Sequence, residues 1–133
     1  MNKVLLALSI MGLSGSLLAQ VSPSTPKATR VQIRQGPEIE LSREYLTIIT
    51  WTVNNPGGSP EHYGVVHYGS NPKDLSQTAQ NPIRLNPSHS SIAFRVRLDN
   101  LKPRTTYYYM VGSMDANGAS DRVTSPVSKF TTP

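Results

Sequence analysis

The clearest pattern in the chain is the strict alternation of apolar and polar residues over residues 91–99. The apolar positions fall on one face: Ile92, Phe94, Val96 and Leu98. Because the side chains of a β-strand point alternately to its two faces, this pattern predicts a strand with one face in a hydrophobic core. Arg95 and Arg97 lie on the other face, and we expect them to be in solvent.

Further segments of the same kind follow one another along the rest of the chain. They are residues 30–34, 45–53, 62–69, 105–114 and 123–131. Their expected core residues are Val31, Ile33, Tyr45, Thr47, Ile49, Trp51, Val66, Tyr68, Tyr107, Tyr109, Val111 and Phe130. Turn-forming residues separate the segments, and no long stretch after the N-terminal region keeps helical periodicity. The pattern therefore predicts an all-β sandwich.

Glycine and proline positions refine this assignment. Gln35-Gly36-Pro37 is expected to end the first strand. Pro126 restricts the last strand to a sheet edge or a bulge, because proline cannot donate to a strand ladder. Residues 74–87 are expected to cross between the sheets with at most a short edge strand. The expected total is seven strands in two antiparallel sheets.

The most informative motif is the turn and strand over residues 101–111. Leu101 and Pro103 form the turn, and Tyr107 lies early in the strand that follows. A tyrosine at this place can hydrogen-bond the backbone just upstream, an arrangement called a tyrosine corner. The spacing resembles that of fibronectin type III domains, which are immunoglobulin-like sandwiches. The residues expected to define this fold are Trp51, Tyr68, Leu101, Pro103, Tyr107 and Phe130.

The N-terminal residues predict export. Residues 1–19 combine Lys3, an apolar stretch and a small residue at Ala19, which is the pattern of a cleaved signal peptide. A membrane anchor is the alternative, but the uncharged stretch is short for a span of about 20 residues. Residues 20–28 form a Ser/Pro-rich linker, and residues 29–133 form the domain. We therefore expect a secreted or periplasmic protein, of a bacterial type, with no membrane span after cleavage.

Composition narrows the classes of partner. The chain has 13 basic and 8 acidic residues, a net charge of +5, and its arginines are scattered rather than clustered. Nucleic-acid binding is therefore not expected. The chain has no cysteine, so the domain must fold on packing alone, without the disulfide of antibody-type immunoglobulin domains.

Two further segments resemble the N-terminal domain of purple acid phosphatases. They are the opening residues 31–37, with Gln35-Gly36-Pro37, and the stretch Tyr68-Gly69-Ser70. The resemblance implies a fibronectin type III-like domain that precedes a metallophosphatase domain. The metal ligands of that family belong to the later domain, and their motifs do not occur in these residues. We therefore expect no enzyme activity, no metal and no cofactor for this chain.

The remaining candidates for chemistry are few. His62, His67 and His89 lack the spacing of a metal site, and we expect them to be single surface histidines. Asp115 and Asp121 flank a predicted hairpin loop, where a weak calcium site is one interpretation and solvated loop acids are the preferred one. Ser88-His89-Ser90 lacks the setting of a nucleophile.

One surface stands out as a candidate for binding. Strands 62–69 and 105–114 should be neighbours in one sheet, and four outward residues would then share a face. These residues are Val65, His67, Tyr108 and Met110, and the adjoining loops are residues 54–61 and 115–121. Aromatic and Met side chains favour protein interfaces, although scattered exposed apolar groups are also normal.

The predicted function is an exported, non-catalytic binding or spacer module that contacts a protein. A cell-envelope glycan is a less favoured partner, because only Tyr63 and Tyr108 could form an aromatic platform. The alternative is an accessory N-terminal domain of a purple acid phosphatase-like metallophosphatase whose catalytic domain is missing from this chain, because it lies on another chain or was lost.

Overall fold

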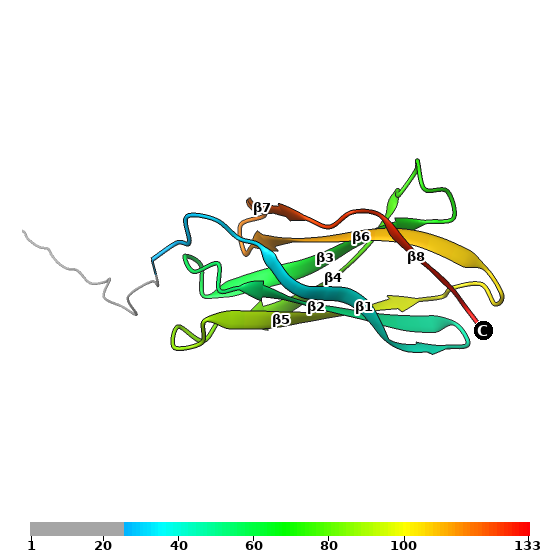
Figure 1. Cartoon of the computed structure of the whole chain (residues 1–133), viewed down its shortest axis with the longest axis horizontal. Coiled ribbons are helices and arrows are strands. Elements are labelled where there is room, and N and C mark those ends of the chain that lie inside the picture. The colour runs from blue at the N-terminus through cyan, green and yellow to red at the C-terminus, as the bar shows by residue number, and fades with distance from the viewer. Residues whose placement is uncertain (1–25) are drawn as a thin grey trace, which may run out of the picture.

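The computed structural model describes residues 26–133, which form two β-sheets packed face to face (Figure 1). The strands are β1 (Ile33–Arg43), β2 (Leu46–Asn54), β3 (Glu61–Gly69), β4 (Gln77–Arg84), β5 (Ser91–Asp99), β6 (Thr106–Asp115), β7 (Ser120–Thr124) and β8 (Ser128–Thr131). The predicted signal peptide and most of the predicted linker lie outside the described residues. Residues 26–133 contain no helix that is long and apolar enough to cross a membrane.

The two sheets have the arrangement expected of a fibronectin-like sandwich. One sheet has the order β1-β2-β5, and the other has the order β4-β3-β6-β7, with β8 also paired to β6. All of these pairings are antiparallel. The predicted fold class is therefore confirmed, and β3 and β6 are neighbours as expected.

The core lies between the sheets and is built around aromatic residues. Trp51 and Phe94 face each other with ring centroids 5.3 Å apart. Tyr107 stacks on Phe130 at 5.7 Å, and its edge meets Tyr68 at 6.4 Å. Burying each side chain of this size stabilises the fold by about 1.5–3 kcal/mol. The alternation predicted for residues 91–99 is confirmed residue by residue, since Arg95 and Arg97 are exposed while their neighbours are buried.

The tyrosine corner is present. The backbone N–H of Lys102 donates to the Tyr107 hydroxyl at 2.9 Å, and Leu101 is buried beside it. Thr132 adds a second tie, because its hydroxyl donates to the carbonyl of Lys102 at 2.6 Å and accepts from the N–H of Thr105 at 2.9 Å. The turn is thus fastened both to the core and to the C-terminal end of the domain.

The first strand was predicted too short. The expected strand at residues 30–34 becomes β1, which continues through Gly36 and Pro37 to Arg43. Gly36 has a φ of 83°, and a Cβ there would lie 2.9 Å from the carbonyl oxygen of Thr50. A glycine therefore lets β1 cross close to β2, and register shifts on both sides absorb the irregularity. Pro37 is tolerated because β1 is an edge strand.

Two further strand predictions were wrong. Residues 77–84 form a full strand, β4, which pairs along nearly all of β3. Most of its side chains are exposed, so an edge strand of this kind shows no apolar alternation. The last predicted strand is divided into β7 and β8 on either side of Pro126. These differences give eight strands where seven were expected.

Tyr45 was also misplaced. We expected it in the core, but its exposed fraction is 56%. Its φ of 74° belongs to a turn, so the strand alternation does not extend back to it. Its carbonyl accepts a hydrogen bond from the N–H of Leu101 at 3.1 Å, which ties this turn to the tyrosine corner.

We predict that Tyr107→Phe lowers the free energy of unfolding by about 0.5–1.5 kcal/mol, because it deletes one buried hydrogen bond and keeps the ring packing. Urea unfolding followed by tryptophan fluorescence measures the change. Tyr108→Phe is the matched control, since Tyr108 lies next along β6 and points to the opposite face. Equal stabilities of the two variants would contradict the role of the corner.

Candidate functional site

The four predicted face residues lie together on the outer side of the β3–β6 pair. His67 is directly opposite Met110 in the ladder, Val65 is opposite Gly112, and Tyr108 is opposite Gly69. Val65, His67, Tyr108 and Met110 are each half-buried. We call these four residues the sheet face.

A hollow of about 320 Å³ adjoins one end of the sheet face. Val65 and His67 line it together with residues of β4, β6 and β7, whereas Tyr108 and Met110 lie outside its lining. Gly112 contributes no side chain at its floor, and a Cβ there would lie 2.8 Å from the carbonyl oxygen of Val123. The site is thus a shallow surface with an open hollow beside it, not an enclosed pocket.

His62 is not a surface histidine, so that prediction was wrong. Its exposed fraction is 1%, and it lies at the start of β3 on the core side. The signal was present in the sequence, since counting back by twos from Tyr68 through Val66 and Gly64 reaches His62. We expected His62 at the surface because it is polar and stands at the boundary between a loop and a strand.

The His62 ring has an acceptor at each nitrogen. Its Nδ1 lies 2.9 Å from Oδ2 of Asp121, and its Nε2 lies 3.0 Å from the carbonyl oxygen of Gly57. A neutral imidazole carries one N–H and could satisfy only one of them. The doubly protonated ring satisfies both, so the surroundings favour the cation.

The same geometry explains the pKa of His62. Burial lowers this pKa, but the hydrogen bond and charge of Asp121, the Gly57 carbonyl and the charge of Asp115 together raise it above the ordinary histidine value. With the ring protonated, the group is a buried ion pair whose cation is held by two acceptors.

Asp121 completes the network from β7. Its Oδ2 also accepts a hydrogen bond of 2.6 Å from the Ser113 hydroxyl on β6. The prediction of a solvated loop acid was wrong for this residue, whose exposed fraction is 8%. A bulge lets β7 turn Asp121 inward, since Gly112 pairs with Thr124 while Met114 pairs with Ser120.

The Asp115 side chain forms hydrogen bonds within its own loop. Its Oδ1 accepts hydrogen bonds from the backbone N–H groups of Asn117 at 2.8 Å and Ala119 at 3.0 Å. The bond from Ala119 is the largest cause that lowers the pKa of Asp115, and the positive charges of His62 and Lys27 act in the same direction. The carboxylates considered for calcium are therefore engaged by protein donors, and no group of three potential metal ligands occurs within residues 26–133.

His89 and its serine neighbours form a polar turn. The Ser88 hydroxyl donates to Oδ1 of Asn86 at 2.7 Å, and Nε2 of His89 lies 3.4 Å from the amide nitrogen of Asn86. Neither contact activates a hydroxyl, because the serine is not bonded to the histidine. This turn has no arrangement for nucleophilic chemistry.

Comparison with known proteins gives a family and a fold. The model of the family described as "Purple acid Phosphatase, N-terminal domain" matches residues 42–132. Comparison with curated proteins gives no match.

Among solved structures, the sensor domain of the anti-sigma factor RsgI4 from Pseudobacteroides cellulosolvens is similar. Its solution structure has 16% identity and a TM-score of 0.50, and the match covers 77% of this chain and 74% of that one. A second structure of that sensor domain has 15% identity and a TM-score of 0.50, with 77% and 87% of the chains covered. At this identity, the likeness concerns the fold alone.

We predict that the His62–Asp121 ion pair makes the free energy of unfolding fall as the pH rises. The pKa of His62 is raised in the folded protein above its unfolded value of about 6.5, so the stabilisation is complete below that pH. It is lost as the pH rises through the folded pKa. Urea unfolding at a series of pH values should show this decline for the wild type and not for His62→Gln.

His89→Gln is the matched control, because His89 is exposed and should leave the decline unchanged. A decline that persists in His62→Gln would mean that another group causes it.

Proposed function

Because the chain belongs to the purple acid phosphatase N-terminal domain family, we propose that it is an exported, non-catalytic module that binds a protein through the sheet face. The observation that carries this proposal is the grouping of Val65, His67, Tyr108 and Met110 on adjacent strands. The signal-peptide pattern of residues 1–19 supports export.

The chemistry of the sheet face favours a protein partner. Tyrosine and methionine are enriched in the cores of protein interfaces, and polar residues usually form the rim. Thr78 and Gln80 of β4 provide such a rim beside Val65 and His67. Lys129 of β8 is opposite Tyr108 and adds a positive charge at the other side.

A glycan is a less favoured partner. Stacking of a sugar ring needs an exposed aromatic platform, and Tyr63 and Tyr108 are both half-buried. They also lie near opposite ends of the β3–β6 pair, since Tyr63 is opposite Met114 and Tyr108 is opposite Gly69. They therefore do not form one platform.

A second candidate function is that of an accessory domain for a catalytic metallophosphatase domain on another chain. The family match favours it, because the family is described as the N-terminal domain of purple acid phosphatases. In this case the partner at the sheet face would be that catalytic domain. A metallophosphatase reading frame beside this one would favour the second candidate over a free-standing module.

We predict that Tyr108→Ala/Met110→Ala loses a partner that the wild type captures from the exported fraction of the source organism. The tagged protein is used as bait, and captured proteins are quantified by mass spectrometry. The substitutions face outward and should change the free energy of unfolding by only about 1 kcal/mol.

Tyr45→Ala is the matched control, because it removes an exposed apolar side chain in the turn between β1 and β2, which belong to the other sheet. The proposal requires that this control retain the partner. Equal capture by the wild type and the Tyr108→Ala/Met110→Ala variant would show that the sheet face is not the binding surface.

We also predict that the purified protein does not hydrolyse a phosphomonoester when supplied with iron, zinc or manganese. The reason is that the described residues bring no group of potential metal ligands together. Release of p-nitrophenol from p-nitrophenyl phosphate measures the reaction. Turnover that co-purifies with the protein and disappears on chelation would contradict a non-catalytic module.

A further inference from the structure

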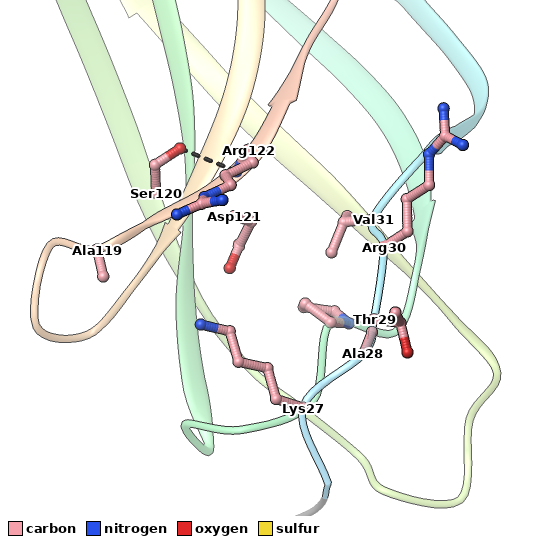
Figure 2. Close-up of a pocket in the computed structure, with 10 residues that line it drawn as sticks. Lys27, Ala28, Thr29, Arg30, Val31, Ala119, Ser120, Asp121 and Arg122 are labelled. Atoms are coloured by element: carbon pink, nitrogen blue, oxygen red, sulfur yellow. Dashed lines mark hydrogen bonds between the residues drawn. The ribbon is translucent and has the colours of Figure 1, made fainter.

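A cleft with a different character lies between the segment of residues 26–37 and the segment of residues 119–126. Two adjoining cavities form it, of about 550 and 510 Å³, and Arg30, Val31 and Arg122 line both. Figure 2 shows the first cavity, with Lys27 extending from the N-terminal segment into the space that faces β7. No residue of the sheet face lines either cavity.

The cleft carries positive charge that is not neutralised by an ion pair. Within residues 26–133, the ion pairs are His62–Asp121, Arg95–Glu40 and Arg97–Asp99. Lys27, Arg30 and Arg122 are exposed and take part in none of them. Asp121 is the acid that lines the cleft, and its Oδ2 is already bonded to His62 and Ser113.

Val31 presents a free backbone edge to this cleft. On the opposite side of the segment, the Asn54 side chain accepts from the N–H of Gln32 at 2.6 Å and donates to the carbonyl of Arg30 at 2.9 Å. Consecutive residues of an extended chain direct their backbone groups to opposite sides. The N–H and C=O of Val31 therefore point away from Asn54, and no hydrogen bond joins them to another residue of the described chain.

Arg122 is held on the rim by the bulge that turns Asp121 inward. Its φ of 59° is uncommon for a residue with a side chain, and its N–H donates to the Ser120 hydroxyl at 2.9 Å. Such backbone strain persists only where the surroundings enforce it, and it concentrates at binding sites. The neighbouring residue, Asp121, is anchored by its buried bond to His62.

We propose that this cleft binds an extended acidic peptide, which adds as a short strand along the Val31 edge. Its backbone pairs with the N–H and C=O of Val31, and its carboxylates lie on Lys27, Arg30 and Arg122. Strand addition is a known mode of peptide recognition, in which main-chain bonds give affinity and side-chain sites give specificity. A sugar or nucleic acid could bond Val31 through single groups, but an extended peptide presents the matching N–H and C=O pair on one residue, which is why a peptide is favoured. This site is additional to the sheet face.

The test measures fluorescence anisotropy with a fluorescein-labelled peptide of alternating Glu and Val, six residues long. We expect saturable binding, and binding at least about tenfold weaker for the Gln/Val peptide and for the Arg30→Gln/Arg122→Gln variant, since each change removes charge-assisted hydrogen bonds. The control Lys102→Gln/Arg104→Gln removes two exposed charges at the tyrosine corner and should bind as the wild type does.

Two further binding measurements distinguish strand addition from simple attraction of anions. A Glu/Val peptide that is N-methylated at alternate residues keeps its charge but loses the backbone donors, and we expect it to bind at least about tenfold more weakly, again by loss of hydrogen bonds. Equal binding of the methylated peptide, or equal binding by the Arg30→Gln/Arg122→Gln variant, would overturn the proposal. Inorganic phosphate that displaces the peptide at the peptide's own concentration would also overturn it, in favour of a free-anion site.

The sheet-face variant Tyr108→Ala/Met110→Ala should bind the Glu/Val peptide with unchanged affinity. Weakened binding by this variant would place the peptide on the sheet face and overturn the assignment to the cleft.

Discussion

The buried His62 ring joins more separate parts of this domain than any other polar group described above. One nitrogen holds Asp121 of β7, and the other holds the carbonyl of Gly57 in the loop between β2 and β3. Ser113 of β6 binds the same carboxylate oxygen, so three strands and one loop meet at a single ion pair. Removing one partner of such a pair is costly, because the other charge is then left in the interior.

The cleft between the N-terminal segment and β7 is organised by this network. The loop that Gly57 belongs to receives the N-terminal segment, where the N–H of Ala28 donates to the carbonyl of Pro56 at 2.8 Å. A Cβ at Gly57 would lie 2.1 Å from the carbonyl oxygen of Pro26, so only glycine permits this contact. The network therefore positions one wall of the cationic cleft through Gly57 and the other wall through Asp121.

Much of the fold could be predicted because it follows from local patterns. The alternation over residues 91–99 and the motif around Tyr107 depend on residues close together in the sequence, and both are present in the structure as expected. The face residues could be predicted for the same reason, since strand alternation settles which side chains share a side of a sheet. Their role in binding remains a proposal.

What could not be predicted depends on contacts between distant segments. β4 places only Ala79 and Ile83 against the core, which is too few apolar positions to show alternation, and it is a strand through its pairing with β3. The bulge in β7 exists because Asp121 reaches His62, which lies 59 residues away in the sequence. The cleft depends on both the bulge and the docking of the N-terminal segment, so no sequence motif marks it. Its charges come from Lys27, Arg30 and Arg122, which look like scattered surface residues until the fold brings them together.

The placement of polar groups separates those that stabilise the fold from those that remain available for contacts with other molecules. His62, Asp121 and Ser113 are the polar residues that most resemble a reactive site, yet each makes hydrogen bonds within the protein. A buried charge without a partner costs several kcal/mol, so such groups are stable only when paired. Once they are paired, they give rigidity to the loops rather than reactivity. Recognition is then left to groups that have free bonding capacity, which here are the strand edge at Val31, the cations around it and the half-buried side chains of the sheet face.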